Sequence, residues 1–294
     1  MNDLRKCLYM CLLATAALLV GASPAFAATP SLGTASGFSV LGGTVTCTTS
    51  VVTGDVGSTG AFTNTGCTIA GGMPPATNTA AATAYADFLS AYAALGSPVS
   101  TPCGTTLTTF PTTPLSPGVY CFASFVASTG GVLTLDGPAN GIWIFKIGTS
   151  GSGYLEGTNF SVFMTGGGQP CNVYWWVAQY ATMTTSALKG NILAGTYITM
   201  TSGANTLAGR ALAKAAVTMT NATVIGCDVL SGSPVCVVPP KPSCDANHQH
   251  HKHCKLHDYD PPHCDGNDDD NGHGSDSRYP FESKHDDGGK GGKK

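Results

Sequence analysis

The chain has 294 residues, of which 42% are hydrophobic and 11% are charged, and its formal net charge is −3. A charge this near zero excludes the electrostatic type of nucleic-acid binder, which carries clustered lysine and arginine. Residues 28–231 contain only five acidic and four basic side chains and no histidine, and their polarity comes from 36 threonines. Acid–base and nucleophilic catalysis need paired titratable groups, so we expect a protein that is not an enzyme.

Residues 1–27 have the pattern of an export signal. Arg5 and Lys6 precede an apolar run, and Ala25-Phe26-Ala27 fits a small-x-small cleavage site. The apolar run is shorter than the ~20 residues that cross a bilayer, which disfavours a retained anchor. We therefore expect a secreted protein without a membrane span after cleavage, in a compartment where disulfides persist.

Ten cysteines follow the expected signal, six in residues 28–231 and four further on. An even number in an exported chain indicates disulfides, although the sequence does not determine the connectivity. Nearest-neighbour pairing in residues 28–231 is one arrangement, and it would join Cys47 to Cys67, Cys103 to Cys121 and Cys171 to Cys227.

The body is predicted to consist of short strands and one helix. From Ser31 to Ala70, β-branched residues alternate with glycine-containing turns, which is typical of closely spaced short strands. Between residues 77 and 95 the sequence is rich in alanine, and its large apolar residues recur three and four positions apart. This spacing predicts a helix with an apolar stripe that packs on a sheet, formed by Tyr85, Phe88, Leu89, Tyr92 and Leu95.

A Thr-Met-Thr motif recurs at 182–184, 199–201 and 218–220, each time followed by a turn and a segment containing leucine or isoleucine with glycine. A period near 20 residues with short strands predicts a stacked solenoid. Side chains alternate along a strand, so we expect Met183, Met200 and Met219 to point inward and the flanking threonines outward. Stacked strands lie ~4.8 Å apart, and the threonines should then form a flat grid of methyl and hydroxyl groups.

An ordered series of short motifs resembles the DUF3494 ice-binding protein family over about residues 32–227. The motifs are Gly54-Asp-Val-Gly57, Pro117-Gly-Val-Tyr120, Leu133-Thr-Leu-Asp-Gly137, Ile142-Trp-Ile-Phe-Lys-Ile147, Cys171-Asn-Val-Tyr-Trp-Trp176, Gly190-Asn-Ile-Leu-Ala194 and Gly209-Arg-Ala-Leu-Ala213. The resemblance implies a mainly β fold: a discontinuous right-handed β-solenoid (β-helix) of triangular cross-section with one long α-helix packed alongside. It also implies that N-terminal coils cap or interleave with C-terminal ones.

Members of that family adsorb to ice through a flat solenoid face, often with T-A/G-x-T/N motifs. Ser202-Gly-Ala-Asn205 and Thr220-Asn-Ala-Thr223 are degraded matches, and Glu156-Gly-Thr-Asn159 begins with a charge that disfavours ice contact. The sequence leaves open whether the Thr-Met-Thr grid, the residues near the turns, or both make the contact. The candidate ice-contacting residues are Thr182, Thr184, Thr199, Thr201, Ser202, Asn205, Thr218, Thr220 and Thr223.

Residues 232–294 are predicted to be a separate, disordered tail because they combine low hydrophobicity with high charge. A Pro239-Pro-Lys-Pro242 linker opens the tail, and histidines and cysteines follow. Zinc, copper or nickel favour such donors, and the competing interpretation is a hydrophilic tail that is tied by disulfides or simply flexible. The candidate metal ligands are His248, His250, His251, His253 and Cys254, and we expect no cofactor that the protein requires.

Two hypotheses follow. In the first, the domain at residues 28–231 belongs to a secreted monomer whose partner is an ice surface, and it inhibits ice growth or recrystallisation. In the second, the solenoid is an extracellular structural or adhesive module whose tail binds metal or a surface, and the threonine face has no role in ice binding.

Overall fold

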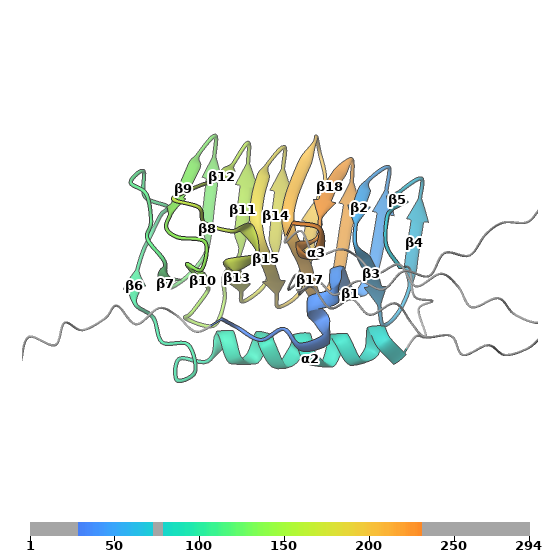
Figure 1. Cartoon of the computed structure of the whole chain (residues 1–294), viewed down its shortest axis with the longest axis horizontal. Coiled ribbons are helices and arrows are strands. Elements are labelled where there is room, and N and C mark those ends of the chain that lie inside the picture. The colour runs from blue at the N-terminus through green and yellow to red at the C-terminus, as the bar shows by residue number, and fades with distance from the viewer. Residues whose placement is uncertain (1–28, 73–78, 231–294) are drawn as a thin grey trace, which may run out of the picture. The chain divides into compact units, whose positions relative to one another are not determined.

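The computed structural model describes residues 29–72 and 79–230, in which parallel strands stack into a β-solenoid with one long helix beside it (Figure 1). The helices are η2 (Gly33–Gly37), α2 (Thr79–Gly96), η3 (Pro170–Asn172) and α3 (Cys227–Leu230). The strands are β1 (Phe38–Thr48), β2 (Val51–Thr53), β3 (Asp55–Ser58), β4 (Phe62–Thr65), β5 (Thr68–Ile69), β6 (Thr105–Thr106), β7 (Gly118–Phe122), β8 (Val126–Thr129), β9 (Val132–Asp136), β10 (Trp143–Ile147), β11 (Leu155–Thr158), β12 (Ser161–Thr165), β13 (Val173–Val177), β14 (Ala181–Thr184), β15 (Ala187–Ala194), β16 (Tyr197–Met200), β17 (Asn205–Thr220) and β18 (Ala222–Ile225).

The strand pairings divide the solenoid into three faces, as the triangular prediction requires. Face a contains β7, β10, β13, the second half of β15, the middle of β17, the first half of β1, and β3. Face b contains β8, β11, β14, β16, the end of β17, the end of β1, and β4. Face c contains β9, β12, the first parts of β15 and β17, then β18, β2 and β5.

The long helix α2 covers face a and runs along the stack of strands (Figure 1). Phe88, Tyr92 and Leu95 are buried against Leu41, Ile144, Tyr174, Leu193 and Leu212 of the sheet, which confirms most of the predicted stripe. Leu89 differs from the prediction because it is 36% exposed, and the alanines at 81, 84 and 91 complete the buried face instead. The buried face of α2 thus consists of three alanines and three large residues, and Leu89 lies at its edge.

The order of coils along the solenoid differs from the order along the chain. β1 lies between β17 on one side and β3 and β4 on the other, so the N-terminal coils continue the stack that the C-terminal coils build. Arg210 of β17 stabilises the junction between the N-terminal and C-terminal coils. Its guanidinium donates hydrogen bonds to the carbonyl of Ser36 and, at 3.0 Å, to Oδ1 of Asn191. The interleaving implied by the family resemblance is confirmed.

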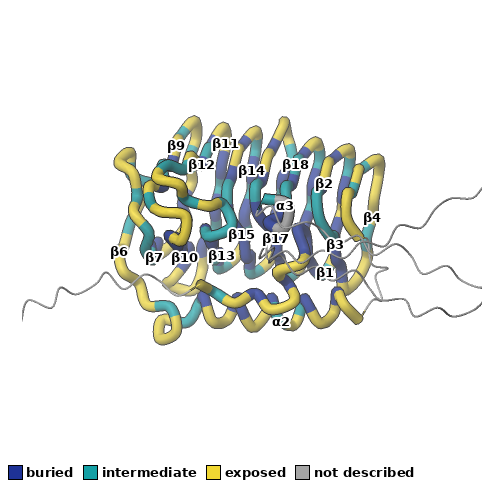
Figure 2. Tube along the Cα trace, viewed as in Figure 1, coloured by how far each residue is buried: buried dark blue, intermediate teal, exposed yellow. Residues whose placement is uncertain are grey.

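Apolar side chains of all three faces form the core between them. Figure 2 shows buried positions recurring along the strands of every coil. Met183, Met200 and Met219 are each 2% exposed or less, so the predicted inward direction of the methionines is confirmed. Phe145 and Trp175 stack with ring centroids 4.2 Å apart in the same core. This continuous packing between neighbouring coils makes the outer surfaces rigid.

Three disulfides join neighbouring parts of the solenoid and confirm the nearest-neighbour pairing: Cys47–Cys67, Cys103–Cys121 and Cys171–Cys227. The expected signal at 1–27 and the predicted tail at 232–294 lie outside the described residues. Within residues 29–72 and 79–230, neither α2 nor any shorter helix is long and apolar enough to cross a membrane.

Candidate functional site

Two straight rows of outward side chains run across the seven strands of face b. The parallel pairing is in register from β8 to β4, so residues at equal positions on successive coils lie beside one another. Thr201 follows the end of β16, and its N–H donates to the carbonyl of Met183 at 3.3 Å, which keeps Thr201 in line. Row 1 is Ala127, Glu156, Thr182, Thr199, Thr218, Thr46 and Thr63; row 2 is Thr129, Thr158, Thr184, Thr201, Thr220, Thr48 and Thr65.

The threonine hydroxyls of both rows are directed to solvent. Among the described residues, no hydrogen bond joins any of these hydroxyls to another protein group, and all twelve threonines are exposed or partly exposed. The buried serines behave differently, since Ser39, Ser58 and Ser186 donate to backbone carbonyls at 2.9–3.1 Å. The rows therefore present a periodic surface of methyl groups and unused hydroxyls to water, on side chains whose β-branched χ1 is restricted.

A tight corner with left-handed backbone follows row 2 on every coil. Thr49, Asn159, Thr185, Ser202 and Asn221 have φ between 42° and 60°. Their coils are cross-linked at this edge, because Thr185 Oγ1 donates to the carbonyl of Ser202 at 3.1 Å and Thr49 Oγ1 donates to Asn221 Oδ1 at 2.8 Å. The corner fixes where face b ends, and so keeps row 2 straight.

A ladder of stacked aromatic rings borders row 1 on the other side. Phe125, Tyr154, Tyr180 and Tyr197 each lie two residues before the row 1 position of their coil, and consecutive ring centroids are 4.8–4.9 Å apart. This separation equals the spacing of neighbouring strands. The ladder ends at Tyr197, and the next coil has Ala216 at the corresponding position.

Glu156 is the only charged side chain among the described residues in the two rows and the ladder. It lies in row 1 between Ala127 and Thr182. Tyr180 donates to its Oε1 at 3.4 Å. Burial and then the negative charge of Glu156 raise the pKa of Tyr180, so the phenol remains a neutral donor at physiological pH.

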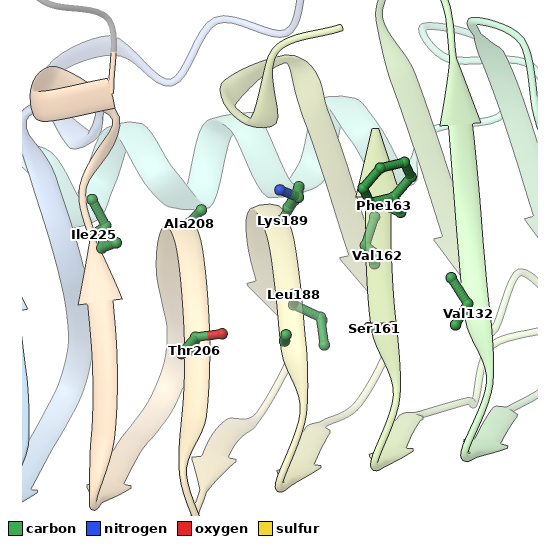
Figure 3. A pocket seen from close by; sticks show the side chains of 10 residues that line it. Val132, Ser161, Val162, Phe163, Leu188, Lys189, Thr206, Ala208 and Ile225 are labelled. Atoms are coloured by element: carbon green, nitrogen blue, oxygen red, sulfur yellow. The ribbon is translucent and has the colours of Figure 1, made fainter. Parts of the chain in front are cut away.

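Face c is less regular than face b. Phe163 and Val132 are more than half exposed, and together with Lys189, Ala208 and Ile225 they line a hollow on this face (Figure 3). The outward side chains of this face therefore differ in height from coil to coil. Face a is covered by α2, so face b is the flat and open face of the solenoid.

The structure brings six of the nine predicted residues together in the two rows: Thr182, Thr184, Thr199, Thr201, Thr218 and Thr220. Ser202 is exposed at the corner beside row 2, and Thr223 points outward on face c. Asn205 must be corrected, because it is 1% exposed and its side chain bonds to the backbone of Ser186, Thr201 and Gly203. The Asn205 side chain is buried and its hydrogen bonds stabilise the corner, so it cannot contact an external surface. We leave Asn205 out of the candidate surface.

Sequence reasoning missed six further threonines of the rows, contributed by β8, β11, β1 and β4. Two of these strands, β1 and β4, carry the same Thr-x-Thr pattern as the recognised repeats, with cysteine or asparagine in place of methionine. A search for Thr-x-Thr with any middle residue would have found the four threonines on β1 and β4, but not Thr129 and Thr158, whose coils have Ala127 and Glu156 in row 1. The missed residues are Thr129, Thr158, Thr46, Thr48, Thr63 and Thr65.

The described residues hold no group of three or more histidine, cysteine or acidic side chains suited to a metal ion. The candidate ligands His248, His250, His251, His253 and Cys254 lie outside these residues. Asp136 and Glu156 do not form a pair of carboxylates suited to acid–base catalysis, because they lie on faces c and b respectively. Asp136 accepts a hydrogen bond from Thr165.

The sequence matches the Ice-binding-like family over residues 27–225. The chain belongs to this family. It is 41% identical over 203 residues to an ice-binding protein of Nostoc sp. (strain HG1), a match that covers 64% of this chain and 71% of that protein.

Solved ice-binding proteins share the fold. The crystal structure of one from the Antarctic ascomycete Antarctomyces psychrotrophicus matches with a TM-score of 0.53 and 28% identity, over 67% of this chain and 98% of that one. An ice-binding protein from an Antarctic biological consortium matches with a TM-score of 0.59 and 27% identity, over 71% of this chain and 96% of that one. The fold of this chain is thus shared with these two solved ice-binding proteins.

Proposed function

We propose that this protein adsorbs to ice through face b and so inhibits the growth or recrystallisation of ice. The observation that carries the proposal is the uninterrupted part of the two rows, ten threonines in register on the five neighbouring strands β14, β16, β17, β1 and β4. The names of the relatives, each an ice-binding protein, support the same activity.

The surface acts by ordering water, and no covalent bond is made or broken. Each hydroxyl can bond to water, and each methyl group leaves the adjoining water without a partner on the protein side. Because the rows are periodic and rigid, these weak contacts recur at fixed intervals, and water held over them can join a crystal lattice. Many such contacts acting together hold the protein on the crystal.

The protein is proposed to work outside the cell as a monomer, without a required cofactor. The six cysteines of the described body are all in disulfides, which suits an oxidising compartment. The pattern of residues 1–27 supports export. Zinc, copper or nickel binding by the tail is a separate proposal, tested by metal retention near neutral pH.

The decisive experiment compares Thr201→Tyr with Thr206→Tyr in assays of thermal hysteresis and recrystallisation. Thr201 is in the middle of row 2, whereas Thr206 points outward on face c at a similar position along the solenoid. A tyrosine at 201 rises above the threonines and should remove most of the activity, and the same change at 206 should leave it. If the unmodified protein lets ice grains coarsen as buffer does, the structural or adhesive module is the better interpretation.

A further inference from the structure

Row 2 continues past the coils that carry the recognised threonine repeats. Thr184 is in register with Thr158, and Thr158 is in register with Thr129. These two threonines are exposed and lie at the same outward position as the other five members of the row. The backbone thus extends the threonine surface over β11 and β8 without a break.

Row 1 is interrupted on these same coils. Glu156 occupies the position that threonine holds on the next five coils, and Ala127 follows on β8. Glu156 has no cationic partner among the described residues, and its described hydrogen bond comes from Tyr180. Glu156 is partly exposed, so its carboxylate remains in contact with water.

A charged carboxylate binds its hydration water more strongly than a hydroxyl does, and removal of that water is costly when no opposite charge replaces it. An ice lattice offers no such charge. Contacts to ice from the two threonines beyond Glu156 are too few and too weak to offset this loss. The carboxylate should hence keep liquid water over β11 and β8.

We propose that Glu156 sets the boundary of the ice-contacting surface, so that Thr158 and Thr129 take no part in adsorption in the native protein. This inference rests on the proposed function. The active surface is then the part of face b formed by β14, β16, β17, β1 and β4. It comprises Thr182, Thr199, Thr218, Thr46 and Thr63 of row 1 with Thr184, Thr201, Thr220, Thr48 and Thr65 of row 2.

The test is a double-mutant cycle of Glu156→Thr and Thr158→Tyr in the full chain, with thermal hysteresis as the readout. Thr158→Tyr alone should leave the activity unchanged, because its coil lies beyond the boundary. Glu156→Thr should raise the activity about 1.5-fold, since contacts at separate positions on one rigid surface add. In the double variant, the tyrosine should abolish this gain.

Two controls separate charge from shape. Glu156→Gln removes the charge with little change of size, and should give part of the gain. Lys189→Thr removes a charge from face c and should give none. Circular dichroism and thermal unfolding of each variant show that the solenoid is intact.

If the unmodified protein is active, two results would overturn the boundary at Glu156 and leave the proposed function intact. One is loss of activity in Thr158→Tyr, and the other is no gain of activity in Glu156→Thr. Inactivity of both the unmodified protein and Glu156→Thr would overturn the proposed function as well. If the unmodified protein is inactive but the Glu156→Thr variant is active, the result supports the boundary. It would also show that the native surface is too small to inhibit ice growth.

Discussion

Thr49 Oγ1 donates a 2.8 Å hydrogen bond to Asn221 Oδ1, although 172 residues of chain separate the two side chains. They occupy equivalent corners of neighbouring coils, one from the beginning of the solenoid and one from its end. The threonine surface is consequently assembled from two distant parts of the sequence. The N-terminal strands should matter for adsorption as much as the recognised repeats do.

Thr48→Tyr should reduce thermal hysteresis as strongly as Thr220→Tyr, because Thr48 and Thr220 are paired in row 2. Both tyrosines lie inside the ice-contacting part of face b, with active threonines on either side, so each ring holds its neighbours away from ice. The matched control is Thr68→Tyr, which places the same ring on exposed β5 of face c. Full activity of Thr48→Tyr would show that the N-terminal strands lie outside the active surface.

The helix and the inward direction of the methionines were predictable because both depend on local spacing. The spacing of Phe88, Tyr92 and Leu95 repeats within one helix, and the alternation around Met200 repeats within one strand. The junction of β1 with β17 was implied by family resemblance and not by any local pattern. Parallel pairing between distant strands leaves no short-range signal in either strand.

The error at Asn205 has a physical cause in the length of one corner. Three residues, Ser202-Gly203-Ala204, separate Thr201 from β17, whereas the single residue Asn221 separates Thr220 from β18. Asn205 therefore pairs with buried Ala222 and not with outward Thr223. The motif match aligns Asn205 with Thr223, one residue away from its true partner. Because a shift of one residue exchanges the inward and outward sides of a strand, the motif alone could not predict which way Asn205 points.

Gly209→Ala should destabilise the fold by about 2–4 kcal/mol. Gly209 pairs with Gly190 where β17 turns from face c to face a, and its φ is +151°. A Cβ at this position would lie 2.0 Å from the carbonyl oxygen of Gly190, so the backbone must move. The free energy of unfolding, from urea denaturation, measures the loss.

Gly130→Ala is the matched control for this change. Gly130 also has a positive φ, +65°, but a Cβ there meets nothing within 4 Å. Its cost should be about 1 kcal/mol, the penalty for a left-handed backbone alone. Equal losses for the two variants would mean that contact with Gly190 contributes nothing.

Removal of the Cys171–Cys227 disulfide should cost more than removal of Cys103–Cys121. The two bridges span 56 and 18 residues. In the chain-entropy account the longer loop contributes about 4 kcal/mol and the shorter about 3 kcal/mol. Paired cysteine-to-serine variants, unfolded in urea under oxidising conditions, should differ by about 1 kcal/mol. A larger loss for Cys103–Cys121 would contradict the entropic account.

Stability should fall between pH 10 and pH 12 because of Tyr92. Its hydroxyl donates to the carbonyls of Val177 and Ala178, both at 3.1 Å, and burial raises its pKa to about 12. The unfolded chain loses this proton near pH 10. In the interval the folded state holds more protons than the unfolded state, so the free energy of unfolding decreases as pH rises, by about 2–3 kcal/mol in total.

Tyr92→Phe separates this effect from other alkaline titrations. The variant loses the one proton that Tyr92 shares between the two carbonyls, and should be about 1 kcal/mol less stable at pH 8. It lacks the phenol proton, so its stability should decline less steeply between pH 10 and pH 12 than that of the unmodified protein. Burial also raises the pKa of Tyr174, and that contribution is common to both proteins and cancels in the comparison. Urea denaturation across this range, with free thiols blocked, gives the two slopes, and equal slopes would show that Tyr92 titrates alike in the folded and unfolded chains.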